Sequence, residues 1–255
     1  DRVIYLADAR QSMHFIQVFR CARKTGIVPD TTELVHIGFG TMNGKDGKPF
    51  KTRDGGVMRL EYLLKEIDDE MLNKIKENQK EKENLNIDEA EAEQTAKTVA
   101  LAAVKYGDLS NQASKDYIFD IDRFTSFEGN TGPYILYTIV RIKSILSKYE
   151  AKGGDISALK DAIMPAVNAG QKNLMLSLAK FNATIESAYE ESAPHKICAY
   201  IYELANAFNG FYHDTKILSE ENEELKKSYI SLLVLTKEIL EACIDMLGFS
   251  APDRM

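Results

Sequence analysis

The sequence has few cysteines, no long apolar run and no excess of positive charge, and each of these absences excludes a class of protein. Its three cysteines, Cys21, Cys198 and Cys243, are far apart and form no C-x-x-C pair, so neither a disulfide framework nor a zinc site is expected. No stretch reaches the roughly 20 apolar residues that a membrane-spanning helix requires, and the first residues lack a signal-peptide pattern. We therefore expect a cytoplasmic protein with no membrane segment and no bound metal.

Positive charge is also scarce, because 32 lysines and arginines face 39 aspartates and glutamates, which gives a formal net charge of -7. Proteins that coat nucleic acid usually carry a net positive field, so any RNA binding here must use local patches. The 255 residues, 44% of them hydrophobic, suffice for one large or two ordinary domains. The chain begins at Asp1 with a strand-like run and no initiator methionine, which indicates a piece of a longer protein.

Two short, largely apolar runs flank an amphipathic segment at the start of the chain. Residues 3–7 and 34–39 have the pattern of buried strands, and residues 11–24 place Phe15 and Phe19 on one helical face. A strand, a helix and a strand within about forty residues predict a right-handed βαβ unit. Two parallel strands alone leave edges unpaired, so we expect the rest of the sheet to lie outside this chain.

A glycine-rich basic segment follows at residues 41–56. Lys45, Lys48, Lys51 and Arg53 lie among glycines that permit close backbone approach to a ligand, so the loop could close over a polyphosphate. The order of glycines and lysines does not match the Walker A pattern G-x-x-x-x-G-K-[ST]. From composition alone, a solvated connection is the simpler interpretation.

The remainder of the chain has a mainly helical pattern. Apolar residues from Leu60 to Ile75 recur three or four positions apart and predict a helix with a charged outer face. After a further helix near 90–106 and an irregular section, apolar stripes predict a compact bundle, with a domain boundary near 123–130. The bundle helices are expected at residues 131–150, 155–169, 171–191, 195–215 and 220–247, separated by Gly153, Gly154, Gly170, Pro194 and a cap at Ser219.

The amino-acid sequence of this loop and its position after the βαβ pattern resemble those of a known family. Residues 48–56, KPFKTRDGG, follow the βαβ pattern and resemble the second signature of class I aminoacyl-tRNA synthetases, usually written K-M-S-K-S. In its arginine form this signature reads G-K-P-F-K-T-R-x-G, which Gly47 to Gly55 match. The chain resembles the arginyl-tRNA synthetase family along nearly its whole length, through DARQSMHF at 8–15, YGDL at 106–109, FDIDRF at 119–124, EGNTGPY at 128–134, FNGFYH at 208–213 and LGFSAPDRM at 247–255.

This resemblance implies a mainly α chain with a small α/β part. Residues 1–125 would be the C-terminal part of a Rossmann-type parallel-sheet catalytic domain with a KMSKS-like loop at 44–56. Residues 126–255 would be an all-α anticodon-binding helical bundle. The family's H-I-G-H signature is absent, because the similar segment from His36 to Gly40 lacks the second histidine, and we expect His36 to be a buried strand residue.

The same resemblance implies a site for arginine and ATP. The amide of Gln11 would contact arginine, and His14 would lie at the edge of the same pocket, although a histidine that only packs is an equal alternative. The end of the second strand would lie beside the adenine, at the carboxyl edge of the sheet. The candidates are Gln11, His14, Gly40 and Met42 for substrate and ATP binding, and Lys48, Lys51, Thr52 and Arg53 as catalytic residues that serve the triphosphate.

An RNA site is implied on the bundle. Single-stranded bases are gripped by stacking on aromatic faces and by hydrogen bonds to their edges, which suits an acidic protein. Taken singly, each tyrosine could instead be a half-buried packing residue with a wet hydroxyl. The anticodon-binding candidates are Tyr134, Tyr137, Arg141, Asn209, Tyr212, His213 and Met255.

The expected activity of the intact protein is that of an arginine-tRNA ligase. It would activate arginine with ATP, accompanied by Mg2+, and transfer it to the tRNA for arginine, as a monomer with no tightly bound cofactor. This chain, which lacks one catalytic signature, is predicted to be inactive alone. Two alternatives remain open: a non-catalytic tRNA-binding module, and a structural helical interaction protein.

Overall fold

The computed structural model describes residues 1–48, 59–81, 88–159 and 162–255, and it divides the chain into two compact units. The N-terminal unit combines the described residues of 1–58 with Asn111–Asp120. The helical unit combines Arg59–Ser110 with Ile121–Met255. A mainly α chain with a small α/β part was predicted, and this fold class is confirmed. The predicted domain boundary between residues 125 and 126 concerns family domains and stays a prediction.

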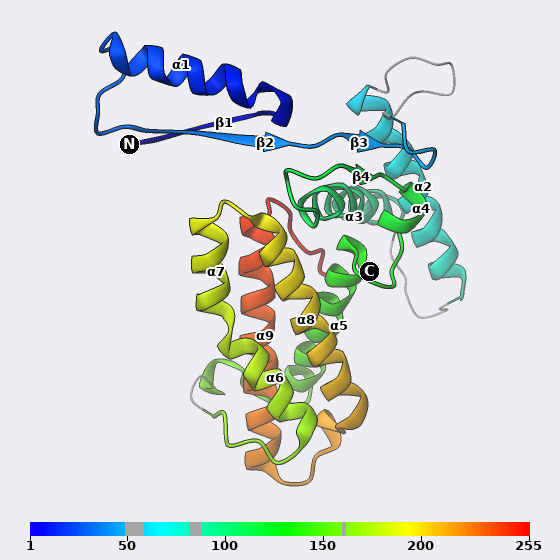
Figure 1. Cartoon of the computed structure of the whole chain (residues 1–255). Helices are drawn as coiled ribbons and strands as arrows, with labels where there is room; N and C mark the ends of the chain where they lie inside the picture. The colour runs from blue at the N-terminus through cyan, green and yellow to red at the C-terminus, as the bar shows by residue number, and fades with distance from the viewer. Residues whose placement is uncertain (49–58, 82–87, 160–161) are drawn as a thin grey trace. The chain divides into compact units, whose positions relative to one another are not determined.

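The N-terminal unit is built on the predicted strand, helix and strand (Figure 1). Strand β1 (Arg2–Asp8) pairs in parallel with β2 (Glu33–Phe39), so that Arg2 lies opposite Glu33 and Asp8 opposite Phe39. A short 3-10 helix, η1 (Ala9–Gln11), leads into α1 (Ser12–Lys24), and Gly26 follows with a φ of 71°, the left-handed conformation expected after a helix end.

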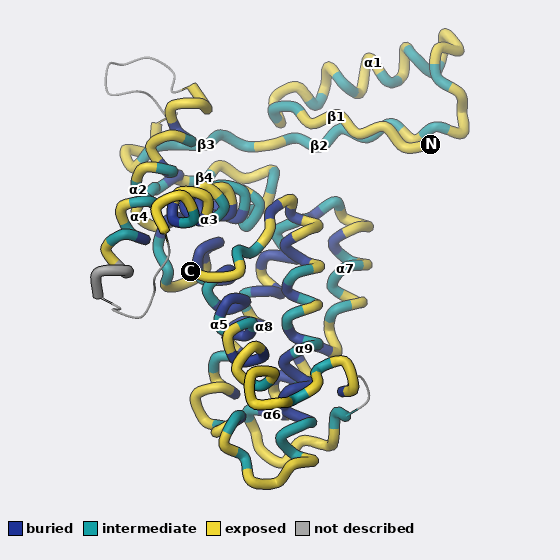
Figure 2. Tube along the Cα trace, turned by 180° about the vertical axis from the view of Figure 1, so that it is seen from behind, coloured by how far each residue is buried: buried dark blue, intermediate teal, exposed yellow. Residues whose placement is uncertain are grey.

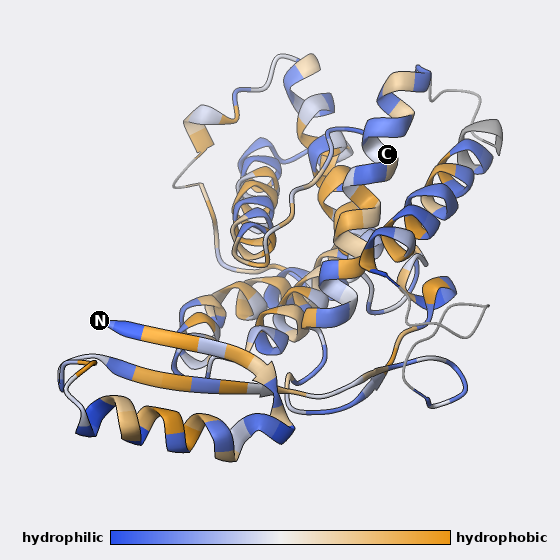
Figure 3. Ribbon diagram, turned by 90° about the horizontal axis from the view of Figure 1, so that it is seen from above, coloured by the Kyte–Doolittle hydropathy of each residue, from blue (hydrophilic) through white to orange (hydrophobic). Residues whose placement is uncertain are grey.

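Helix α1 packs through aromatic rings on one face of the β1–β2 pair. The ring of Tyr5 lies 5.4 Å from that of Phe15 and 5.3 Å from that of Phe19, and His36 stacks on Phe15 at 4.5 Å. His36 therefore lies in a strand, as predicted, but it is half-buried rather than buried. The strands are largely apolar (Figure 3), and on the other face Leu6 is 69% exposed.

A second, very small parallel pairing was not predicted. Strand β3 (Met42–Asn43) pairs with β4 (Tyr117–Ile118), although both segments were expected to be irregular. The prediction was wrong there because a two-residue strand is too short to show any sequence period. The Thr41 amide also donates to Asp116 Oδ1 at 2.6 Å, and this bond joins the two segments of the unit.

The helical unit holds most of the buried residues, which Figure 2 shows in dark blue along α5, α8 and α9. The apolar stripe of α5 is buried as predicted, with Ile135, Ile139 and Ile142 fully enclosed. The elements are α2 (Leu60–Glu81), α3 (Glu89–Leu109), α4 (Ile121–Phe124), α5 (Gly132–Ala151), η2 (Ser157–Leu159), α6 (Ala169–Ala179), α7 (Phe181–Glu190), α8 (Pro194–Asp214), η3 (Ile217–Ser219) and α9 (Glu223–Met246).

The predicted helix at 155–169 is wrong. Serines on α9 bind the backbone of this segment instead: the Ser231 hydroxyl donates to the Leu159 carbonyl at 2.7 Å, and Ser228 Oγ accepts from the Met164 amide at 2.9 Å. Pro165 also lacks the amide that a helix interior needs. Tertiary hydrogen bonds therefore replace helical ones in this segment.

Three predicted helix boundaries also differ. Gly170 lies inside α6, which is capped by Asn168, and α9 is capped by Asn222 rather than Ser219. The expected helix at 171–191 is divided at Lys180, which ends α6 and precedes α7. Asparagine is among the residues that best cap a helix, and its side chain supplies the first-turn hydrogen bond in both places.

A helix near residues 90–106 was predicted, but α3 continues to Leu109, so Gly107 lies inside it. A Cβ added at Gly107 would meet the Phe124 ring at 2.7 Å, so the glycine allows α4 to approach closely. Gly210 in α8 offers a contrast, because an added Cβ there meets nothing within 4 Å. Glycine is thus required for packing at position 107, whereas position 210 leaves room for a side chain.

Substituting alanine at each position should change stability in opposite directions. Gly107→Ala should lower the free energy of unfolding by about 1 kcal/mol or more, because overpacking outweighs the gain in helix propensity. Gly210→Ala should raise it by roughly 0.5 to 1 kcal/mol. Urea unfolding followed by circular dichroism measures both changes. Equal shifts in the same direction would contradict the packing role of Gly107.

Candidate functional site

The carboxyl ends of β1 and β2 meet at one edge of the N-terminal unit, where ligands of parallel sheets usually bind. A Cβ added at Gly38 would lie 2.8 Å from the Ala9 Cα, so the end of β2 touches the turn that follows β1. Gln11, at the end of η1, and Gly40, just beyond β2, therefore belong to the same edge of the sheet.

An ion pair holds the turn before Gln11. Asp8 accepts hydrogen bonds from the Arg10 guanidinium at 2.9 and 2.6 Å and from the Arg10 amide at 2.8 Å. These side-chain and backbone hydrogen bonds lower the pKa of Asp8 to about 2. The Gln11 side chain does not cap α1, and it is exposed at the sheet edge. Its amide is therefore not occupied by the helix that follows.

The other predicted ligands of this edge lie in different surroundings. His14 is exposed, with its ring edge-on to Phe15 at 5.7 Å, so the contact role and the packing role stay open. Gly40 has a structural requirement of its own, because an added Cβ would lie 2.4 Å from the Lys115 carbonyl carbon. Met42 lies in β3 opposite Tyr117.

Only the first part of the predicted catalytic loop belongs to the described residues. Lys48 is exposed, and the turn before it is closed by a hydrogen bond from the Gly44 amide to the Lys48 carbonyl at 2.8 Å. Gly47 has a φ of 72°, which glycine adopts without strain. Lys51, Thr52 and Arg53 lie outside the described residues, so their assignments stay predictions.

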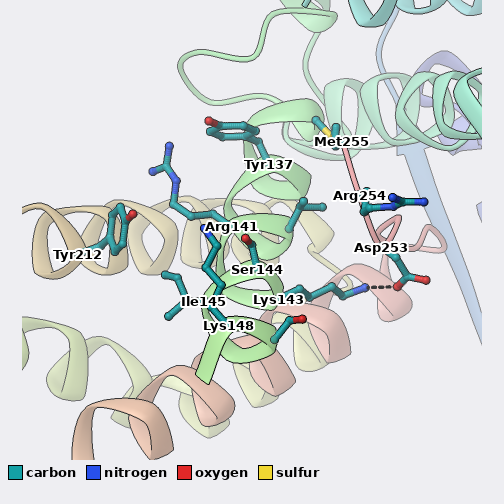
Figure 4. A pocket seen from close by; sticks show the side chains of 12 residues that line it. Tyr137, Arg141, Lys143, Ser144, Ile145, Lys148, Tyr212, Asp253, Arg254 and Met255 are labelled. Atoms are coloured by element: carbon teal, nitrogen blue, oxygen red, sulfur yellow. Dashed lines mark hydrogen bonds and ion pairs between the residues drawn. The ribbon is translucent and has the colours of Figure 1, made fainter. Parts of the chain in front are cut away.

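In the helical unit, a groove of about 810 Å3 lies along α5 (Figure 4). It gathers side chains from α5, from α8 and from the C-terminal tail, which comprises residues 249–255. Four of the predicted anticodon-binding residues line it. These are Tyr137, Arg141, Tyr212 and Met255.

Arg141 lies between the two aromatic rings of this groove. Its guanidinium carbon is 4.7 Å from the centre of the Tyr137 ring and 5.5 Å from that of Tyr212. The Asn209 Oδ1 accepts a hydrogen bond from Arg141 at 2.5 Å. A guanidinium stacked on aromatic faces and fixed by an amide keeps its remaining donors directed in one orientation.

Asn209 and Tyr134 stand behind this arrangement and do not line the groove. Asn209 Nδ2 donates to the Tyr134 hydroxyl at 2.9 Å, and that hydroxyl donates to Asn206 Oδ1 at 2.6 Å. Their polar groups are therefore engaged between α5 and α8. His213 is likewise outside the groove, exposed at the end of α8 and 2.9 Å from Asp214.

The sequence analysis missed several groove residues. The missed charged and polar side chains on α5 include Ser144 and Lys148, which follow Tyr137 and Arg141 with helical spacings of four, three and four. This spacing places all four on one helix face and could have revealed them. The others are Lys143, Ser147, Asp253 and Arg254.

The C-terminal tail and the residue that precedes it are tied to the helices by three cations. Lys143 Nζ contacts Asp253 Oδ1 at 3.3 Å, and Arg254 pairs with Glu91 of α3 at 2.9 Å. Lys105 donates to the Gly248 carbonyl. Exposed ion pairs are individually weak, but together these contacts fix one wall of the groove.

The cysteines offer no chemistry at either place. Burial raises the pKa of Cys198 and Cys243 to about 12, so neither is a thiolate at neutral pH. All three cysteines are free, and no cluster of possible metal ligands occurs among the described residues. Within those residues, no helix is both long and apolar enough to span a membrane.

Comparison with protein families identifies the class of both parts. Residues 1–121 match the family described as tRNA synthetases class I (R), catalytic domain, and residues 135–255 match the DALR anticodon binding domain. The chain thus joins part of a class I aminoacyl-tRNA synthetase catalytic domain to an anticodon-binding domain. The groove lies in a helical unit whose residues from 135 onward belong to the second match.

Individual relatives define the family more closely. The chain is 54% identical over 255 residues to the arginine-tRNA ligase of Alkaliphilus oremlandii and 43% identical over 257 residues to that of Francisella tularensis. Each match covers 100% of this chain and 42% of the relative. The chain belongs to the arginyl-tRNA synthetase family and spans less than half the length of these relatives.

Solved structures agree. The arginyl-tRNA synthetase of Plasmodium falciparum matches with a TM-score of 0.80 and 27% identity, covering 100% of this chain and 41% of that one. The Thermus thermophilus enzyme matches with a TM-score of 0.78, covering 99% of this chain and 41% of that one. Its 24% identity supports the likeness of fold alone.

Removing Arg10 should release the pKa of Asp8. In Arg10→Gln, this pKa should rise from about 2 towards its ordinary value of 3.8. Because the folded-state pKa is lowered, the stabilising effect of the pair is present above pH 3.8 and is lost as the pH falls towards 2. Carboxyl-carbon NMR titration measures the change. Asp155, whose pKa is lowered by Ser157, is an internal control and should not move. Identical Asp8 titrations in parent and variant would rule out the Arg10 clamp.

Proposed function

We propose that the chain is part of an arginine-tRNA ligase, which activates arginine with ATP and transfers it to the tRNA for arginine. The observation that carries the proposal is the groove in which Tyr137, Arg141, Tyr212 and Met255 come together. The monomeric state and the cytoplasmic location expected from the sequence belong to the same proposal.

In this proposal the groove receives unpaired bases of the anticodon loop. Bases stack on the rings of Tyr137 and Tyr212 that line the groove, and Met255 offers an apolar contact at the far wall. The guanidinium of Arg141 supplies donors to acceptor atoms on a base edge. Asn209 and Tyr134 support Arg141 and the ring of Tyr137 by fixing α5 against α8.

The N-terminal unit supplies part of the ligase site. Gln11 and His14 bind arginine, while Gly40 and Met42 lie beside the adenine of ATP. Lys48, Lys51, Thr52 and Arg53 contact the triphosphate and stabilise the charge that develops when the arginine carboxylate attacks the α-phosphorus. Mg2+ would enter with the nucleotide, bound mainly by phosphate oxygens. The clamp between Asp8 and Arg10 holds the turn that presents Gln11.

Binding to tRNA tests the anticodon role directly. The chain should bind the tRNA for arginine more tightly than a tRNA with an unrelated anticodon, measured by gel-shift titration. Tyr212→Ala should weaken cognate binding by about tenfold, because a stacked base contributes roughly 1 to 3 kcal/mol. Tyr189→Ala is the matched control, since Tyr189 is an exposed tyrosine of α7 that does not line the groove. Equal affinity for both tRNAs would favour a structural helical interaction protein.

Catalysis by the isolated chain is tested separately. We expect no ATP–pyrophosphate exchange in the presence of arginine, because the H-I-G-H signature that completes the nucleotide site is not part of this sequence. Exchange would be measured with labelled pyrophosphate, using a full-length family member as the positive control. Robust exchange by these 255 residues alone would refute the view that the chain holds only part of the catalytic site.

A further inference from the structure

Two lysines of α5 line the groove but differ in their surroundings. Lys143 Nζ lies 3.3 Å from Asp253 Oδ1 and 3.4 Å from Glu241 Oε1, and it also donates to the Pro252 carbonyl at 3.3 Å. Two carboxylates therefore match its single charge. Lys143 is occupied in holding the C-terminal tail against α5 and α9.

Lys148 has no such neighbours. It is exposed, and among the described residues no carboxylate forms an ion pair with it. Its side chain runs back along α5 towards Ser144 and Arg141, the usual direction for a long side chain on a helix (Figure 4). Arg141 likewise has an amide and two rings as its partners rather than a carboxylate. The floor of the groove thus holds two unmatched positive charges in a protein of net charge -7.

The spacing of these charges suits a strand laid along the helix. Lys148 follows Arg141 by seven residues, which places its backbone roughly 10 Å further along the axis. A base stacked on Tyr212 or Tyr137 carries a phosphate on each side, and one of them would lie towards Lys148. An ammonium group binds phosphate as a point charge and needs no fixed orientation, unlike the guanidinium of Arg141.

We propose that Lys148 binds a backbone phosphate of the RNA strand that occupies the groove, and that Lys143 acts as a positioning residue for the tail. This inference rests on the proposed function, since it assumes that the groove takes RNA. Lys143 also neutralises Asp253, which would otherwise repel the phosphate at the opposite wall. Lys148 is therefore expected to affect binding through a direct charge contact, and Lys143 through the position of the tail.

The salt dependence of RNA binding distinguishes a phosphate contact from an effect on the tail. A phosphate contact releases counterions, so each lost contact reduces the slope of log K against log salt concentration by about 0.7 to 0.9. We would measure binding of the 255-residue chain to an anticodon stem-loop of the tRNA for arginine, and to one with an altered anticodon, at several salt concentrations. The variants are Lys148→Gln, Lys148→Arg, Lys143→Gln and, as a charge-matched control on α6, the exposed Lys172→Gln.

Lys148→Gln should reduce the slope by about 0.7 to 0.9, the amount expected for one phosphate contact. It should weaken binding to both RNAs by the same factor, roughly three- to tenfold, so that the ratio of their affinities is unchanged. Lys148→Arg should restore the slope, and Lys172→Gln should leave it at the parent value. Lys143→Gln should weaken binding with the parent slope, and it should speed amide hydrogen exchange in the tail, which Lys148→Gln should not.

The outcomes distinguish this inference from the proposed function. If the parent chain discriminates the anticodons but Lys148→Gln keeps the parent slope, the phosphate role is overturned and the proposed function stands. If Lys143→Gln lowers the slope as Lys148→Gln does and leaves tail exchange unchanged, the division between the two lysines is wrong. If the parent chain binds neither RNA or does not discriminate them, the proposed function fails and this inference fails with it.

Discussion

The packing of one helix decides where the candidate RNA groove can be. Helix α5 buries Ile135, Ile139 and Ile142 against the rest of the helical unit, and those side chains fix its rotation about its own axis. With 3.6 residues per turn, Tyr137, Arg141 and the residues that continue their stripe must then face outward. Loss of one of these three isoleucines would therefore damage the groove without changing any residue that lines it.

The same core places the partner ring of the groove. Phe208 and Phe211 of α8 are fully buried, and Phe208 stacks with Tyr212 at 6.0 Å. The tyrosine ring is thereby supported from its inner side while it remains partly exposed to the groove. The aromatic surface is built in before any ligand arrives, so little conformational entropy remains to be lost there on binding.

Sequence patterns predicted the elements whose signals are local. The apolar periods of α1, α2, α5 and α9, and the apolar runs of β1 and β2, gave the right element types because burial of one face leaves a visible repeat. The prediction of a helix at 155–169 was wrong because Ser228 and Ser231 of α9, which are distant in sequence, form hydrogen bonds with the backbone of this segment. Strands β3 and β4 were not predicted because a strand of two residues is too short to show a sequence period. The contacts of a segment with elements distant in sequence belong to the tertiary structure, so they cannot be predicted from the local sequence of that segment.

The sequence predicted some residues of the candidate groove and missed others. Family resemblance supplied Tyr137, Arg141, Tyr212 and Met255, which the structure brings into one groove. It also supplied Asn209 and Tyr134, whose polar groups instead join α5 to α8. Lys143 and Lys148 were not distinguished from other surface lysines, because what separates them is whether a carboxylate lies beside each one in three dimensions.

The hydrogen bonds around Asn209 have a direction. Arg141 donates to its oxygen, its nitrogen donates to the Tyr134 hydroxyl, and that hydroxyl donates onward to Asn206. Each donor polarises the next, and reversing any one amide would set two donors or two acceptors against each other. An aspartate at position 209 would keep the shape and attract Arg141 more strongly, yet it would accept the Tyr134 hydroxyl proton itself and so break the hydrogen bond from that hydroxyl to Asn206. The amide suits this position because it carries one donor group and one acceptor group, whereas the near-isosteric carboxylate carries two acceptors.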